Sequence, residues 1–140
     1  MNATVQDLLD REAIRDVLLR YARGVDRKDL DLVAACFTPD AAYDGALGVG
    51  TVATALAALH SAMARYAATM HFMPHQHIEL HGDSATSETY AVAYHRLAGE
   101  PTLFTVGVRY LDELSRHGDR WLIHRRIVKT EWRESRGLRG

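Results

Sequence analysis

The second half of this chain consists of long stretches in which apolar and polar residues alternate, separated by short turns that contain glycine. Alternation places successive side chains on opposite faces of the backbone, which is the pattern of half-buried β-strands. We predict strands over residues 69–81, 85–97, 102–115 and 120–132. Tight turns join antiparallel neighbours, so these strands should form one sheet whose apolar face needs a covering layer.

The first half of the chain has the apolar spacing of helices instead. Apolar residues recur every three or four positions over residues 5–27, 29–37 and 51–66, which predicts three helices. Residues 41–44 predict a short strand, and the glycine-rich residues 45–50 predict a loop that lacks the lysine of a phosphate-binding loop. We therefore expect an α+β barrel, in which helices cover a strongly curved, mixed but mostly antiparallel sheet around a cone-shaped central cavity.

Length and charge narrow the class of protein. A chain of 140 residues is one domain by size, and we expect this domain over residues 1–132 and a frayed C-terminal tail over residues 133–140. A net charge of −1 does not favour nucleic acid or an anionic membrane as a partner. The single cysteine, the charged N-terminus and the lack of a membrane-length apolar stretch lead us to expect a cytoplasmic protein.

A histidine-rich stretch, TMHFMPHQHIEL at residues 69–80, holds three of the eight histidines in an otherwise mostly apolar run. Its first histidine, His71, has three interpretations: a base in a pocket, a metal ligand or a hydrogen-bonded histidine of the core. By pattern alone, the core interpretation is the simplest, because a lone histidine in an apolar run needs only one partner.

The other two histidines of the stretch suggest a metal site as an alternative. His75 and His77 are two residues apart, so on a strand they point the same way, and such a pair can bind zinc or iron. Glu79 extends the same face, and a further ligand would have to be His95 or Glu88. We expect no metal and no other cofactor, and interpret this face as a half-exposed surface in a subunit interface.

Several segments of the chain resemble one protein family. They are residues 14–44 (IRDVLLRYARGVDRKDLDLVAACFTPDAAYD), Met70-His71, residues 82–96 (GDSATSETYAVAYHR), residues 106–116 (VGVRYLDELSR) and residues 119–126 (DRWLIHRR). In these segments the chain resembles the SnoaL-like branch of the nuclear transport factor 2-like superfamily. The resemblance implies the fold expected above. It implies function only broadly, because this superfamily includes dehydratases, isomerases, dehydrohalogenases, cyclases, epoxide hydrolases and non-catalytic binders.

Within that superfamily, the chain is most similar to lyases that need no cofactor: scytalone dehydratase, hexachlorocyclohexane dehydrochlorinase and bile-acid 7α-dehydratase. Their Asp–His pair matches Asp26 and His71. The resemblance also implies site residues at Arg126, Tyr21 and His95. The chain departs from scytalone dehydratase in the residue before Asp26, where a valine replaces a tyrosine, so we expect a different mode of substrate activation.

The implied residues suggest proton abstraction. Asp26 would fix the tautomer of His71, whose neutral imidazole would take the proton. Arg126 or the hydroxyl of Tyr21 or Tyr43 would stabilise the negative charge that develops. Strict alternation over residues 120–132 places Arg126 on the face that also carries Leu122, His124 and Val128.

We expect the rest of the pocket to be mainly apolar, as a hydrophobic cyclic substrate requires. Besides His95 and Tyr43, the expected pocket residues are Phe37, Leu56, Met63, Phe104, Val106 and Val128. The expected function is that of a cofactor-independent lyase or isomerase of the dehydratase type. The alternative is a non-catalytic small-ligand binding or accessory domain of the same fold. Related proteins pack their sheet faces together, so we also expect a homodimer or homotrimer.

Overall fold

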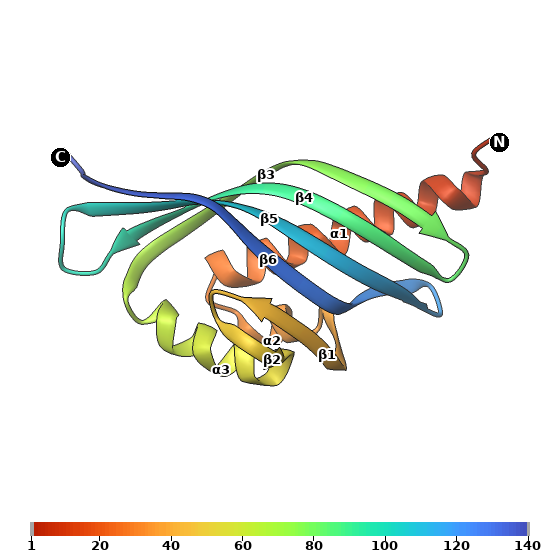
Figure 1. Cartoon of the computed structure of the whole chain (residues 1–140), viewed down its shortest axis with the longest axis horizontal. Helices are drawn as coiled ribbons and strands as arrows, with labels where there is room; N and C mark the ends of the chain where they lie inside the picture. Colours follow the sequence, from red (N-terminus) through yellow and green to blue (C-terminus); the bar gives the residue numbers. More distant parts are fainter. Residues whose placement is uncertain (1, 140) are drawn as a thin grey trace.

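A computed structural model describes residues 2–139, in which three helices and six strands follow one another (Figure 1). The helices and strands are α1 (Val5–Asp26), α2 (Leu30–Ala34), β1 (Phe37–Gly45), β2 (Gly48–Thr51), α3 (Val52–Met63), β3 (Tyr66–His81), β4 (Ser84–Leu97), β5 (Thr102–His117) and β6 (Arg120–Gly137). The strands form one sheet in the order β2-β1-β6-β5-β4-β3, and only the β1–β6 pair is parallel within the described residues. Figure 1 shows β3 to β6 arching over α1, with α3 and the β1–β2 hairpin on the same side. The α+β architecture is the expected one.

The helices begin at polar caps. The Thr4 hydroxyl accepts a hydrogen bond from the Asp7 backbone N–H, and the Asp7 carboxylate accepts one from the Thr4 N–H, so a capping box starts α1. Helix α2 ends at Ala34, earlier than expected, because Phe37 already pairs with Ile123 of β6. None of the helices in residues 2–139 is long and apolar enough to cross a membrane.

The glycine-rich segment forms a hairpin where we expected a loop. Strand β2 pairs with β1 from Gly45–Gly48 to Ala42–Thr51. Gly48 and Gly50 have φ angles of 115° and 149°, which side chains other than glycine rarely adopt. The glycines therefore permit the extended pairing and do not prevent it.

Strand β6 also differs from expectation in its length. We expected a frayed tail from residue 133, but β6 pairs with β5 up to the Gly137–Thr102 pair. The Leu138 N–H then donates to the Pro101 carbonyl at 2.6 Å. Charged residues dominate this end of β6 and are exposed, so the sequence lacks the alternation that marks the earlier strands.

Two β-bulges reset the alternation of β6. The register with β5 shifts between Glu113 and Leu114 and again between Gly107 and Val108, and at these points β6 carries the extra residues His124 and Glu131. Each extra residue turns the following side chains to the opposite face. The strict alternation that we expected over residues 120–132 was therefore wrong. One face of β6, which points toward the core and the cavity, carries Trp121, Ile123, Arg126, Val128, Thr130 and Arg133.

Helix α1 covers the free edge of β3. Among residues 2–139, that strand pairs only with β4, so the backbone groups on its other side need partners. Arg11 donates to the Ile78 carbonyl at 2.6 Å, and Lys28 donates to the Tyr66 carbonyl at 2.8 Å. The carboxylate of Asp26, between them on the chain, accepts a backbone N–H of the same strand. Polar side chains of α1, and Lys28 just beyond its end, thus fix the position of the helix along the sheet edge.

A buried ion pair lies under the middle of the sheet. The Arg126 guanidinium donates to both carboxylate oxygens of Asp112, at 2.7 and 2.8 Å, and the two side chains are 1% and 0% exposed. The rings of Tyr21 and Tyr110 lie 4.2 and 4.3 Å from the guanidinium carbon. Two charge-assisted hydrogen bonds and two aromatic rings offset part of the lost hydration of this cation, while its Nη1 has no hydrogen-bond partner among the described residues.

Removing the anion of this pair should destabilise the protein strongly. Asp112→Ala leaves a buried guanidinium without its counter-charge and should lower the free energy of unfolding by about 3–5 kcal/mol in urea denaturation. The matched control is Glu113→Ala on the same strand, whose exposed pair with Arg125 at 3.4 Å should contribute less than about 1 kcal/mol. Equal losses for the two variants would contradict this account of the core.

Candidate active site

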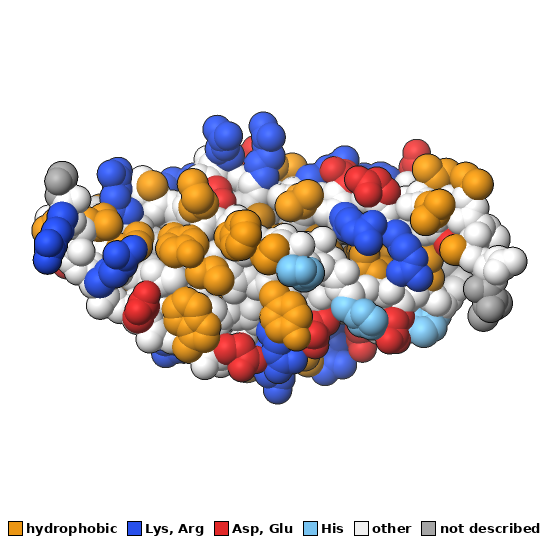
Figure 2. All heavy atoms as spheres, turned by 90° about the horizontal axis from the view of Figure 1, so that it is seen from above, with side chains coloured by type: hydrophobic (Ala, Val, Ile, Leu, Met, Phe, Trp, Pro, Cys, Tyr) orange, Lys and Arg blue, Asp and Glu red, His pale blue; other side chains and the backbone are white. Residues whose placement is uncertain are grey.

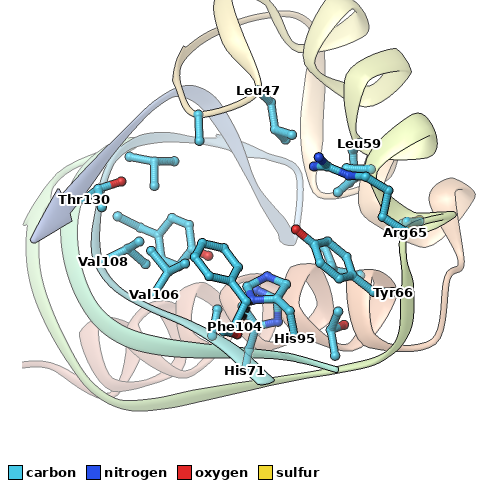
Figure 3. Close-up of a pocket in the computed structure, with 18 of the residues that line it drawn as sticks. Leu47, Leu59, Arg65, Tyr66, His71, His95, Phe104, Val106, Val108 and Thr130 are labelled. Carbon is cyan, nitrogen blue, oxygen red and sulfur yellow. Dashed lines mark hydrogen bonds between the residues drawn. The ribbon is translucent and has the colours of Figure 1, made fainter. Parts of the chain in front are cut away.

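A cavity of about 250 Å³ lies between the concave face of the sheet, the C-terminal end of α1 and helix α3 (Figure 3). Most of its wall is aromatic or aliphatic. Of the residues expected in a pocket, those that line this cavity are Tyr21, Tyr43, Met63, His71, His95, Phe104, Val106 and Val128. Phe37 and Leu56 do not; they line a narrow adjoining hollow, behind Tyr21 and Tyr43.

Asp26 and His71 meet at the wall of this cavity. One carboxylate oxygen of Asp26 lies 2.7 Å from Nδ1 of the His71 ring, and the other accepts the His71 backbone N–H at 2.9 Å. The Thr69 hydroxyl donates to the first oxygen at 2.8 Å. The contact expected between the two residues is therefore present, and two further donors from β3 hold the carboxylate in place.

The position of Asp26 in the fold explains why it needs these donors. It is the last residue of α1, where the helix dipole places partial negative charge and disfavours a carboxylate. The neighbouring edge of β3 supplies a backbone N–H, a hydroxyl and an imidazole, which together offset this cost. An ionised aspartate is thus stabilised by specific hydrogen bonds at a place where the helix alone would not favour it.

The same contacts set the protonation of the pair. Burial raises the pKa of Asp26, but the hydrogen bonds from the side chain and backbone of His71 outweigh it and hold that pKa below its usual range. An ionised Asp26 makes Nδ1 of His71 the protonated nitrogen of the neutral ring. The side chain of His71 is 6% exposed, and the ring lines the cavity, so Nε2 is its free basic atom.

A second histidine lies beside the first. His95, on β4, donates from Nδ1 to the Phe104 carbonyl at 3.1 Å, and its ring centre is 6.4 Å from that of His71. Tyr66 packs against it with ring centres 4.7 Å apart (Figure 3). Burial lowers the pKa of His95, which favours a neutral ring at pH 7. Two imidazole rings therefore share this part of the cavity, and burial disfavours the charged form of His95.

Arg126 is not the pocket cation that we expected. It does not line the cavity, and the bulge at His124 and the bond to Asp112 place it in the core, behind Tyr21 and Tyr110. Burial raises the pKa of Tyr21, partly opposed by Arg126, and the pKa of Tyr110 is raised well above the usual value, again mainly by burial. Both phenols line the cavity and keep their protons at neutral pH, so they remain potential hydrogen-bond donors.

The cavity also contains residues that sequence reasoning missed. Tyr66, Arg65, Tyr110 and Arg133 belong to its wall. Tyr66 and Arg65 follow the end of α3, and their sequence carries no motif. Arg133 lies in the part of β6 that we expected to be a frayed tail, so the sequence reasoning did not consider it for the cavity.

The metal alternative finds no support in the geometry. His77 and Glu79 are exposed and lie 3.2 Å apart on the outer face of the sheet, whereas His95 lies in the cavity on the opposite face. No group of three or more potential metal ligands occurs within residues 2–139.

Comparison with known proteins agrees with this architecture. A family model described as SnoaL-like domain matches residues 6–127, so the chain belongs to the SnoaL-like family, whose fold is that of the nuclear transport factor 2-like superfamily. No protein with a curated description matches the chain.

Several solved structures have the same fold at low sequence identity. One is proposed to be a scytalone dehydratase, from Novosphingobium aromaticivorans: 19% identical, TM-score 0.85, covering 96% of this chain and 92% of that one. Another is a hexachlorocyclohexane dehydrochlorinase from Novosphingobium barchaimii: 17% identical, TM-score 0.80, covering 92% and 91%. A third is a protein of unknown function from Mycobacterium tuberculosis: 21% identical, TM-score 0.79, covering 94% and 77%. At these identities the likeness establishes the fold and no activity.

The effect of these hydrogen bonds on the pKa of Asp26 can be measured. In a carbon-13 NMR titration of the carboxyl group, Asp26 should titrate below its ordinary value of 3.8, and His71→Ala should raise that pKa. Because the folded-state pKa is depressed, the stabilising contribution of Asp26 is complete above the ordinary value and is lost as pH falls through the lower one. His75→Ala, on the exposed outer part of β3, is the control and should leave the titration unchanged. A pKa of Asp26 at or above its ordinary value would contradict the proposed hydrogen bonding.

Proposed function

We propose that this chain is a cofactor-independent lyase or isomerase of the dehydratase type, which removes a proton from a small, hydrophobic, cyclic substrate. The observation that carries the proposal is the bond of 2.7 Å between Asp26 and His71 at the wall of a largely apolar cavity. A carboxylate so fixed orients the imidazole and stabilises the imidazolium that forms when the ring takes a proton. Solved structures named as a dehydrochlorinase and as a proposed dehydratase share this fold, which agrees with elimination chemistry.

The proposed reaction begins at Nε2 of His71. This atom accepts a proton from a carbon next to a carbonyl or leaving group, while the Nδ1–H remains hydrogen-bonded to Asp26. In an elimination, the electron pair of the broken C–H bond forms the double bond, and the leaving group departs with its own electron pair. In an isomerisation, the proton returns to another carbon of the substrate.

Hydrogen-bond donors in the cavity are placed to stabilise the negative charge of that step. Tyr21 and Tyr110 keep their phenolic protons, and the hydroxyl of Tyr66 belongs to the same cavity wall. Preorganised donors in a site shielded from water stabilise a developing oxyanion more than they stabilise the neutral substrate. The aliphatic remainder of the wall suits an apolar ring, as expected for a substrate of this class.

The outer face of the sheet supports a proposed homodimer or homotrimer. Five large apolar side chains are exposed on it: Met70, Phe72, Tyr90, Tyr94 and Trp132. Figure 2 shows apolar side chains gathered there, with charged groups around them. Monomers rarely expose large contiguous apolar patches. The same face of a second copy could cover this patch, and the contact would lie on the side of the sheet opposite the cavity. A monomeric mass in analytical ultracentrifugation at micromolar concentration would refute the assembly.

Mutation of the dyad tests the proposed function. Purified protein would be screened against cyclic ketones, β-hydroxy cyclic ketones and halogenated rings, with deuterium incorporation from D₂O and product release as readouts. With an active compound, His71→Ala should lower kcat by about 10²- to 10⁴-fold with little change in substrate binding, because proton transfer occurs only in the transition state. Asp26→Asn should impair the same step, and the double variant should be little worse than the worse single variant.

The control for this series is His75→Ala, which changes a histidine of the same strand outside the cavity and should keep full activity. Full activity of His71→Ala would refute the dyad mechanism. Ligand binding without turnover of any compound, unchanged by Asp26→Asn, would favour the alternative of a non-catalytic binding domain.

A further inference from the structure

Two arginines carry positive charge at the wall of a cavity that is otherwise mostly apolar. Arg65 and Arg133 both line it, and no aspartate or glutamate among the described residues does so. The nearest carboxylate of the site, Asp26, lies behind His71 and accepts three hydrogen bonds from β3. Neither arginine forms an ion pair within residues 2–139, whereas Arg109, Arg116 and Arg126 each bind carboxylates of the protein.

The backbone around Arg65 holds its side chain at one side of the cavity. The Arg65 N–H donates to the Ala62 carbonyl at 3.0 Å, and the Arg65 carbonyl accepts from the Ala98 N–H at 3.0 Å. The guanidinium carbon lies 5.6 Å from the centre of the Tyr66 ring. Figure 3 shows Arg65 and Tyr66 extending together into the pocket region, with the guanidinium toward Leu59. An aromatic ring beneath it helps to orient this exposed cation.

Arg133 reaches the cavity from another side. It lies on β6 opposite Val106 of β5, and the bulge at Glu131 puts it on the face that carries Thr130 and the cavity-lining Val106. Two strands, β4 and β5, separate β6 from β3, which Tyr66 begins. Both arginines therefore line one cavity but reach it from different elements, the connection between α3 and β3 and the strand β6.

We propose that the substrate of this site is a cyclic hydrophobic compound that carries a carboxylate, bound by Arg65 and Arg133 while its ring reaches His71. This inference rests on the proposed function for the role of His71, but the anion preference itself concerns binding alone. Guanidinium groups pair with carboxylates through two parallel N–H···O bonds, and the apolar wall around them weakens competition from water. A fixed carboxylate would also orient the ring, so that one C–H bond faces Nε2 of His71.

The test compares two probes of the same shape that differ by one charge: 1-naphthoate and 1-naphthamide. Isothermal titration calorimetry would give Kd for the unmodified protein and for Arg65→Gln, Arg133→Gln and the double variant, at low and high salt. Naphthoate should bind roughly tenfold more tightly than naphthamide, and salt should weaken only the naphthoate complex. Each single variant should weaken naphthoate binding about threefold to tenfold and change naphthamide binding less than about twofold.

Arg136→Gln is the matched control, because Arg136 lies on the same strand, is exposed and does not line the cavity. It should keep the full preference for naphthoate, which separates a specific contact from the overall charge of the protein.

Equal affinity of the unmodified protein for the two probes, or a preference that survives the double variant, would overturn the proposal. Because this readout needs no turnover, an anion preference in a protein without activity would refute the proposed function and leave the anion site standing. Turnover of neutral rings that depends on Asp26 and His71, without a preference for naphthoate, would support the proposed function and refute the anion site.

Discussion

The carboxylate of Asp26 is the contact on which both the fold and the proposed chemistry depend. It ends α1, and its two oxygens accept three hydrogen bonds from the edge strand β3. Those bonds connect the covering helix to the sheet at the level of the cavity, and they fix the ring of His71. A carboxylate at a helix C-terminus opposes the helix dipole, and the three hydrogen bonds from β3 offset that cost. In the proposed function the same bonds also orient the imidazole.

The arginines at and behind the cavity wall differ in their burial. The buried pair of Arg126 with Asp112 lies behind Tyr21 and Tyr110, where its carboxylate neutralises the guanidinium. The two arginines of the cavity wall have no such partner in the described residues and are exposed. The first cation stabilises the packing of the aromatic wall, while the other two are the cations that we propose to bind the substrate carboxylate.

The order of the helices and strands could be predicted because it follows from local patterns: the 3.6-residue spacing of α1 and α3 and the alternation of β4 and β5. Asp26 and His71 could be paired because both match a family motif. The register of β6 could not be predicted, since His124 and Glu131 are ordinary strand residues, and only pairing with β5 shows that each is extra. The resemblance led us to expect Arg126 in the cavity, whereas Arg133, which lines it, was assigned to a tail.

The protonation state of His71 tests the central claim most directly, and nitrogen-15 NMR of the labelled imidazole measures it without any substrate. The account predicts that the neutral ring carries its proton on Nδ1, toward Asp26, and presents an unprotonated Nε2 to the cavity. In Asp26→Asn that tautomer should lose its predominance, while His75 should give the same spectrum in both proteins. A neutral His71 protonated on Nε2, or a tautomer unaffected by Asp26→Asn, would contradict the claim that this carboxylate prepares the histidine to act as a base.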